Sequence, residues 1–466
     1  MRWIEKPFES LPTAKRYPLY ALALLTLVNL LNYIDRQVLP AVAPLMLRDE
    51  TLHLTDSELG YIEAALLLSF TFFAPIFGLL GDRFRRTRLI TVAALIWSLA
   101  TAATGLIPQL VGQTADFRFR LPVLGSVLSG AAVALCFIRA LVGIGESAYS
   151  TITPSLIADY FTPRRRATAL GIFQAAIPIG FSLGFVIGGV LAHFFGWRVA
   201  FTLVGLPGIV TAISIWNLRE PHRGALDGFS DSLAPKTKIS WWTTIERILS
   251  TRDWLLSTIG YTALTAALGA FATWATVLLA RDKGMPEASA AITLGIITLI
   301  GGAIGTFGGG WLADLIPRRR SEAYFSVCAV SALLAIAPTL VALAADDQRV
   351  YLPATFIAVV LLFISNAPLN AILLQCVPPE ERATAVALNI VAIHAFGDAI
   401  SRAAVGVLSD LIGNGSLPQL AAIGAWLRID PAREHLSVAL LIAPASLVIS
   451  TLFFFWGALT TKRSAL

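Results

Sequence analysis

Four charged residues lie within stretches of the chain that are otherwise apolar, and they are the residues best suited to chemistry. Asp35 and Arg36 share one such stretch, and Arg139 and Glu146 share another. A charge at the centre of a membrane span costs about 2.5 to 3.5 kcal/mol even on the lenient insertion scale, so each needs a partner or a task. We therefore treat these four residues as a candidate proton-handling cluster.

Helical geometry limits how these charges pair. Arg139 and Glu146 are seven residues apart and share a face, whereas Asp35 points about 100° away from Arg36. In the functional interpretation Asp35 is the first choice of proton acceptor, and Arg139 or Arg36 holds it when it is deprotonated. Protonation then breaks the ion pair and permits a rearrangement. The structural alternative is a static buried salt bridge.

A second set of charges follows a four-residue step: His394, Asp398 and Arg402. On one helix they would form a ladder, which could act as a proton relay, an anion site or a self-satisfied packing element. An HxxxD pair could also bind a metal in a membrane enzyme, but no third ligand lies nearby in the sequence. We expect no metal, no cofactor and no enzymatic activity.

Other polar and aromatic residues of the spans are candidates for contact with a substrate. The candidates are Asn32, Tyr33, Glu63, Tyr149, Asn366, Asn370, His394 and Asp398. Glu63 lies near the outer end of its span, either as a gate residue or as a glutamate that snorkels to the surface. Asn366 and Asn370 share a face and either contact substrate or bond between helices. An apolar pocket could be lined by Tyr33, Phe173, Phe271, Trp274 and Phe363.

The elements that must position these residues are membrane spans. Of the 466 residues 56% are hydrophobic and 14% charged, which is too little polar surface for a soluble globule. Apolar runs of roughly 20 to 30 residues predict an all-α integral membrane protein with twelve helices. The predicted spans are 18–45, 57–80, 89–108, 124–158, 167–195, 198–217, 254–281, 287–316, 322–344, 351–376, 383–412 and 436–459. The fourth run is long, so we expect an extra outer piece before Ser129.

The distribution of Lys and Arg predicts the orientation. Most of the 35 basic residues fall in alternate loops, which places both termini in the cytoplasm if positive loops stay inside. The net charge of +6 follows from this topology, so we expect no nucleic-acid partner. The first apolar run is too long for a signal-peptide core and no cleavage site follows it. We predict a multi-pass protein of the cytoplasmic (inner) membrane.

An internal repeat divides the chain into two halves. The loop GLLGDRFRRTR at 78–88 matches GWLADLIPRRR at 310–320, and PRRRATA at 163–169 matches PEERATA at 379–385. These matches predict two six-helix halves, 1–217 and 254–466, joined by a cytoplasmic linker, 218–253. Trp241 and Trp242 in the linker indicate either an amphipathic interfacial helix or a solvated segment with aromatic anchors.

These motifs resemble those of known transporters. GLLGDRFRRTR resembles the signature between helices 2 and 3 of the major facilitator superfamily, although Arg85 stands where glycine is usual. NYIDR at 32–36, RALVGIGESAYSTITPSLIADYF at 139–161 and AIPIGFSLGF at 176–185 resemble the spinster family. The chain is thus identified as a spinster-like major facilitator transporter, a bacterial homologue.

The resemblance implies roles for several residues. It places helix 1 beside helix 4, so that Asp35, Arg36, Arg139 and Glu146 would form one cluster for coupling and substrate binding. We expect Asp82, Arg83 and Arg86 to cap and latch helix ends on the cytoplasmic side and to stabilise the outward-open state.

Two glycine stripes complete the pattern. Helix 5 carries Gly180, Gly184 and Gly188, and helix 8 carries Gly301, Gly305 and Gly309. Small residues at this spacing permit close crossing of helices. Because helices 5 and 8 meet between the halves in this superfamily, we expect the stripes to let the halves rock.

The resemblance implies a secondary transporter of an amphiphile, such as a lysolipid or a sphingoid phosphate, that is proton-coupled and works by alternating access. A polar organic anion or a drug-like compound is the alternative substrate, and a uniporter would not depend on the carboxylates. The sequence has no nucleotide-binding loop, which argues against an ATP-driven pump. The expected partners are the substrate, protons and membrane lipids, and the expected state is a monomer.

Overall fold

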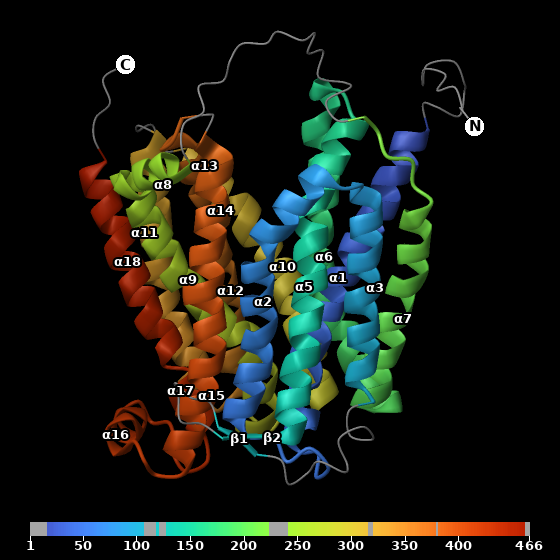
Figure 1. Cartoon of the computed structure of the whole chain (residues 1–466). Coiled ribbons are helices and arrows are strands. Elements are labelled where there is room, and N and C mark those ends of the chain that lie inside the picture. The colour runs from blue at the N-terminus through green and yellow to red at the C-terminus, as the bar shows by residue number, and fades with distance from the viewer. Residues whose placement is uncertain are drawn as a thin grey trace.

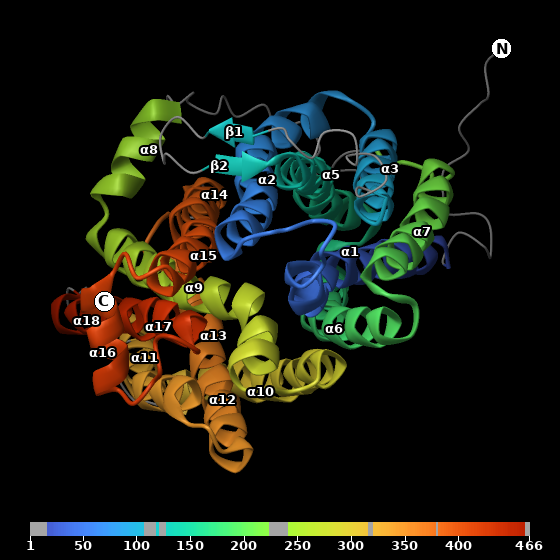
Figure 2. The same cartoon turned by 90° about the horizontal axis from the view of Figure 1, so that it is seen from below.

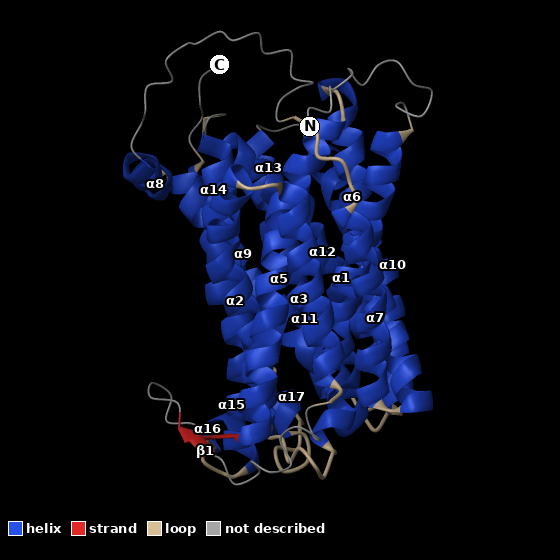
Figure 3. Ribbon diagram, turned by 45° about the vertical axis from the view of Figure 1, so that its right-hand side comes forward, coloured by secondary structure: helices blue, strands red, loops and turns tan. Residues whose placement is uncertain are grey.

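The chain forms a bundle of long helices (Figure 1, Figure 3). The residues described by the computed structural model are 16–106, 118–120, 127–222, 241–315, 320–378 and 381–461. Within them, twelve helical segments are long and apolar enough to cross a membrane. The predicted all-α fold with twelve spans is confirmed.

The first half contains six spans. They are α1 (Tyr17–Leu47), α2 (Asp56–Arg83), α3 (Arg86–Thr104), α5 (Gly130–Tyr160), α6 (Pro163–Phe195) and α7 (Trp197–Trp216). Within this half α1 packs on α6, α2 on α5, and α3 on both α5 and α7. A capping box fixes the start of α2, because Thr55 and Glu58 satisfy each other's backbone N–H groups.

The second half also contains six spans, and most of them consist of more than one segment. They are α9 (Arg252–Val277) with the π-helix η1 (Leu278–Asp282), α10 (Glu287–Leu315), α11 (Arg320–Ala344), α12 (Gln348–Ile364) with α13 (Asn366–Gln375), α14 (Arg382–Ala392) with the π-helix η3 (Ile393–Asp398) and α15 (Ala399–Gly413), and α17 (His435–Ala439) with α18 (Ile442–Thr460). The short α16 (Pro418–Trp426) precedes the last span.

Three further elements mark the ends of the bundle. Strands β1 (Arg118–Arg120) and β2 (Val127–Ser129) pair antiparallel at one end, which we call the hairpin end. Helix α8 (Trp241–Ser250) lies at the opposite end, the α8 end (Figure 1). The extra piece expected before Ser129 is therefore strand β2. A helix forms at Trp241, while residues 223–240 of the predicted linker lie outside the described residues.

The glycine stripes pack inside the halves, so the prediction that they line the contact between halves is wrong. A Cβ on Gly184 of α6 would lie 2.6 Å from the Cβ of Gln37 on α1. A Cβ on Gly305 of α10 would lie 2.3 Å from the carbonyl oxygen of Val360 on α12. The stripes therefore serve close helix crossings within each half.

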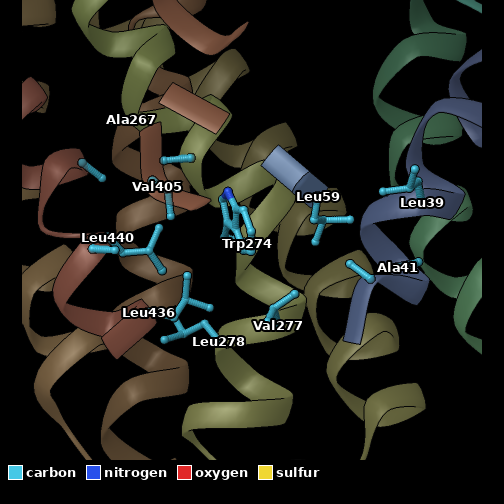
Figure 4. Packing of buried hydrophobic residues seen from close by; sticks show 14 of the residues in the cluster. Leu39, Ala41, Leu59, Ala267, Trp274, Val277, Leu278, Val405, Leu436 and Leu440 are labelled. Atoms are coloured by element: carbon cyan, nitrogen blue, oxygen red, sulfur yellow. The ribbon is translucent and has the colours of Figure 1, made fainter. Parts of the chain in front are cut away.

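The halves meet mainly where α2 packs on α15 and α6 packs on α10 (Figure 2), and α1 also contacts α9. Trp274 on α9 is fully buried close to this seam, and its indole N–H donates to the carbonyl of Arg402 at 3.0 Å. Figure 4 shows Trp274 between Val405 of the second half and Leu59 of the first. The hydrophobic core is thus continuous across the two halves.

Candidate functional site

Arg36 on α1 is paired with Glu146 on α5. Arg36 Nη2 lies 2.9 Å and Nε 3.1 Å from Glu146 Oε2. The Glu146 side chain is 1% exposed and that of Arg36 13%. Because both charges lie within membrane spans, each compensates the other. Two members of the predicted cluster are therefore in contact.

Glu63 on α2 links the two halves. Its Oε1 accepts a hydrogen bond from Arg139 Nη2 at 2.9 Å, and its Oε2 accepts one from Arg402 Nη1. Glu63 is fully buried, and both arginines are nearly so. Arg139 belongs to the first half and Arg402 to the second. The interpretation of Glu63 as a snorkelling surface glutamate is therefore wrong.

A signal for this pair was present in the sequence. Glu63 lies seven residues from the start of α2 at Asp56, and Arg139 lies nine residues from the start of α5 at Gly130. Both helices start at the hairpin end, so at about 1.5 Å per residue the two charges lie at similar depth. Opposite charges at one depth on neighbouring spans predict a pair.

Asp35 differs from the predicted arrangement. It is 1% exposed, and neither carboxylate oxygen makes a hydrogen bond of good geometry within the described residues. The indole N–H of Trp97 lies nearby and is also without a well-placed acceptor. Arg36 and Arg139 are taken by the two glutamates, so neither arginine holds Asp35 in this conformation.

Aromatic contacts connect the charged residues of the first half with those of the second. The ring of Phe70 on α2 lies 5.3 Å from the Arg36 guanidinium carbon and 5.8 Å from the His394 ring. His394 Nδ1 lies 3.1 Å from Asp398 Oδ2, and Asp398 is close enough to attract Arg36. His394 and Asp398 remain partly exposed. The charged residues of the two halves therefore approach one another around Phe70.

The eleventh span, which consists of α14, η3 and α15, does not contain the predicted three-residue ladder. His394 and Asp398 pair as expected, but both belong to the π-helix η3. Arg402 follows one four-residue step later, in the regular helix α15. Arg402 instead reaches Glu63 in the other half. The prediction of a self-satisfied ladder is therefore wrong. His394 and Asp398 form a pair, and Arg402 links the two halves.

A cavity of about 230 Å³ lies beside these charges. Aromatic side chains form much of its wall: Phe181, Phe185, Phe271 and Phe363. Asp398 and Arg402 also line it. The cavity therefore combines an apolar wall with one acidic and one basic group, which suits an amphiphilic ligand.

Several predicted substrate contacts lie away from this cavity. Trp274 and Tyr149 are fully buried, and the Tyr149 hydroxyl donates to a backbone carbonyl of α1. Phe173 packs against Tyr149, with ring centroids 6.2 Å apart. Asn32 is also buried, and Tyr33 stacks near Arg36 at 5.6 Å. In this conformation these residues do not line the cavity.

The predicted contact residues of the tenth span, Asn366 and Asn370 on α13, lie towards the α8 end. Asn370 is exposed, and its side-chain amide donates to the backbone carbonyl of Asn366 at 2.9 Å. The bond lies within one helix, so it is not the interhelical bond that was considered. A role for either asparagine with substrate stays a prediction.

The hairpin end is closed by polar contacts that we did not predict. Arg281 binds both carboxylate oxygens of Asp56 at 2.9 Å, and Ser409 Oγ lies 2.6 Å from Asp56 Oδ2. Asp410 accepts from the backbone N–H of Ser57 at 2.8 Å. These charges lie at the ends of apolar runs, where a sequence gives no indication of which loop faces which.

The predicted gating residues lie at the α8 end. Arg86 is buried, and its Nη1 lies 2.6 Å from Asp159 Oδ2 while its Nε lies 3.2 Å from Glu220 Oε1. These bonds join helix ends within the first half. Asp82 and Arg83 are exposed at the same end. Their part in gating stays a prediction.

Two halves of six spans, with buried charges that meet at their seam, are typical of membrane transporters that are built from structural repeats. A model of the Major Facilitator Superfamily matches residues 25–401. Protein spinster homolog 1 of Homo sapiens is 34% identical over 83% of this chain and 72% of its own length. The sphingosine-1-phosphate transporter SPNS2 of Danio rerio is 32% identical over 95% and 84%. The chain belongs to the spinster family of the major facilitator superfamily.

Solved structures agree on the fold. A bacterial homologue of the human lysosomal transporter spinster, in an inward-facing and unoccupied conformation, superposes with a TM-score of 0.77 at 22% identity, over 96% of this chain and 98% of its own. A D-xylose–proton symporter reaches 0.70 at 16% identity, over 94% and 97%. The predicted family is thus confirmed, and the family consists of transporters.

Proposed function

We propose that the chain is a proton-coupled secondary transporter of an amphiphile with an anionic head group. The observation that carries this proposal is the cavity, in which the Arg402 guanidinium offers a site for the head group and Phe181, Phe271 and Phe363 offer one for the tail. The zebrafish relative named as a sphingosine-1-phosphate transporter supports a substrate of this kind. Lysolipids and sphingoid phosphates have an anionic head group and an apolar tail of this kind.

Asp35 is the proposed proton acceptor. Its carboxyl group is buried without a well-placed hydrogen bond, so the ionised form would need a new partner. Arg36 and Arg139 lie nearby but are held by Glu146 and Glu63. Loss of the proton from Asp35 would draw an arginine away from its glutamate and so alter the contact between halves.

The position of the ion pairs between the halves supports an assignment of the side to which this conformation opens. Within the described residues, ion pairs between the halves gather towards the hairpin end, at Asp56 with Arg281 and at Glu63 with Arg402. We take the α8 end as cytoplasmic, which makes this conformation inward-facing and leaves Asp82, Arg83 and Arg86 to latch the opposite state. The protein then acts as a monomer in the cytoplasmic membrane.

Transport into proteoliposomes tests the substrate class. Labelled sphingosine phosphate and lysophosphatidate should accumulate under an imposed pH gradient, and a short polar dicarboxylate should not. Ala358→Phe, which fills the cavity wall, should abolish accumulation, whereas Leu299→Phe on an exposed face of α10 should not. Accumulation of the dicarboxylate alone would favour the alternative of a polar organic anion.

A further inference from the structure

A second, larger cavity lies on the other side of α9, with a volume of about 550 Å³. It is a groove between α9, the α14–η3 segment and α18, and its wall is mostly apolar, with Leu255, Ile259, Ala263, Val391 and Ile449. It shares no lining residue with the cavity that contains Asp398. The groove is therefore separate from the proposed substrate site.

The length of the groove matches one leaflet of a bilayer. On α9 its lining runs from Trp254 to Ala266, which at about 1.5 Å per residue is roughly 18 Å. Half of a hydrocarbon core of about 30 Å is roughly 15 Å. An acyl chain that enters from the α8 end would fill the groove.

The α8 end of the groove carries a positive charge. Arg252, exposed at the start of α9, lies over the ring of Trp456 on α18 at 5.6 Å. Trp456 is half exposed, and Leu249 of α8 lines the groove. Exposed tryptophan and arginine at the end of a span are typical of the head-group region of a membrane.

One buried polar group inside the groove has no partner. The Thr258 side chain is 4% exposed, lines the groove and makes no hydrogen bond through its hydroxyl within the described residues. A buried hydroxyl without a partner costs roughly 1 to 3 kcal/mol, so a bound acceptor would be favoured. Thr258 lies six residues below Arg252, about 9 Å along the helix. Ester carbonyls lie at such a depth below a lipid phosphate.

We propose that this groove binds one phospholipid of the leaflet at the α8 end. The Arg252 guanidinium donates to the phosphate, the Thr258 hydroxyl donates to an ester carbonyl, and one acyl chain lies between α9, α14 and α18. The lipid is a fixed component of the second half and not the transported substrate. Because it touches α9 and the segment that contains η3, its binding stabilises their packing.

Native mass spectrometry of the delipidated full-length protein tests the site, with dioleoyl phosphatidylglycerol as the probe. Wild type should bind one lipid tightly, and dioleoylglycerol, which lacks the phosphate, should not replace it. Arg252→Gln should weaken the tight binding about tenfold, the usual effect of losing a charge-assisted hydrogen bond. Ala263→Phe, which fills the groove, should abolish it.

The matched control is Arg88→Gln. Arg88 lies over Trp216 at the same 5.6 Å but outside the groove, so this variant should keep the tight lipid. Phosphatidylglycerol should also raise the melting temperature of wild type and of Arg88→Gln, and not that of Arg252→Gln. Equal binding of phosphatidylglycerol by wild type, Arg252→Gln and Ala263→Phe, or equal binding of dioleoylglycerol, would overturn the proposal.

Discussion

Arg402 on α15 donates a hydrogen bond to Glu63 on α2, so a fully buried ion pair crosses the boundary between the two halves. The other carboxylate oxygen of Glu63 binds Arg139 of its own half. One carboxylate thus holds two arginines that would otherwise repel each other. If the halves separate here, Arg402 must leave Glu63, and the energy of this contact stabilises the closed hairpin end.

Glu63→Gln should therefore destabilise the closed hairpin end. The variant leaves Arg139 and Arg402 buried without a counter-charge, and breaking a buried pair in this way costs about 3 to 5 kcal/mol. We expect a lower melting temperature in detergent and a shift towards greater distances between spin labels at Glu50 and Arg428, which are exposed at that end.

The control for this variant is Glu246→Gln, which removes an exposed carboxylate on α8. It should change neither the melting temperature nor the distances. An unaltered distance distribution in Glu63→Gln would show that the pair does not hold the halves together.

The pair of Asp56 and Arg281 should contribute to the same closure. Asp56→Asn and Arg281→Gln should each lower the melting temperature. The double variant should lose less free energy of unfolding than the two single variants lose together. A double-mutant cycle should give an interaction energy of about 1 to 3 kcal/mol, because the pair is bidentate and its aspartate is nearly buried. Additive losses would contradict a direct interaction.

Two glycines on α6 allow a matched test of the close crossing with α1. Gly184→Ala should destabilise the protein by about 1 to 3 kcal/mol, because its Cβ would lie within 2.7 Å of the carbonyl oxygen of Ile34. Gly171→Ala meets no atom within 4 Å and should be neutral or slightly stabilising. Equal melting temperatures for the two variants would contradict the crossing.

The loop between α1 and α2 should show a pH-dependent stability through Asp49. Burial raises the pKa of its carboxyl group, but hydrogen bonds from Arg198, Thr51 and Trp197 lower it by more, so the pKa lies well below its usual range. A lowered pKa stabilises the fold above the unfolded value of about 3.9, and this contribution is lost as the pH falls below it.

Asp49→Asn should therefore have a lower melting temperature than wild type at pH 7. The difference between the two melting temperatures should become smaller between pH 5 and pH 3. Asp430→Asn, at an exposed position of the same end, should leave the melting temperature unchanged. A difference in melting temperature that stays constant with pH would mean that the charge of Asp49 does not contribute to stability.

The spans and their division into halves could be predicted because they depend on patterns that any membrane imposes. Apolar length fixes a span, and repeated loops reveal two equivalent halves. The contact of Arg36 with Glu146 lay within the predicted cluster for the same reason, since a charge inside a span requires a partner. Which partner it takes depends on depth and on helix rotation, and for that reason Asp35 was assigned an arginine that binds elsewhere.

Features that depend on backbone irregularity or on the contact between halves could not be predicted. The π-helix at His394 leaves no mark in the spacing of apolar residues. The partner of Arg402 is Glu63 of the other half, and no spacing along one helix indicates that contact. The closure by Asp56 and Arg281 joins residues from two halves that no local pattern relates. The glycine stripes correctly indicated close crossings, but small residues do not specify which neighbour crosses.

The most direct test of the account is amphiphile flux into proteoliposomes with and without a pH gradient, for wild type and Asp35→Asn. We predict that the gradient drives accumulation in wild type, and that Asp35→Asn loses gradient-driven accumulation while it retains exchange at equal pH. Flux in wild type that does not respond to pH, and that the substitution leaves unchanged, would contradict proton coupling through Asp35.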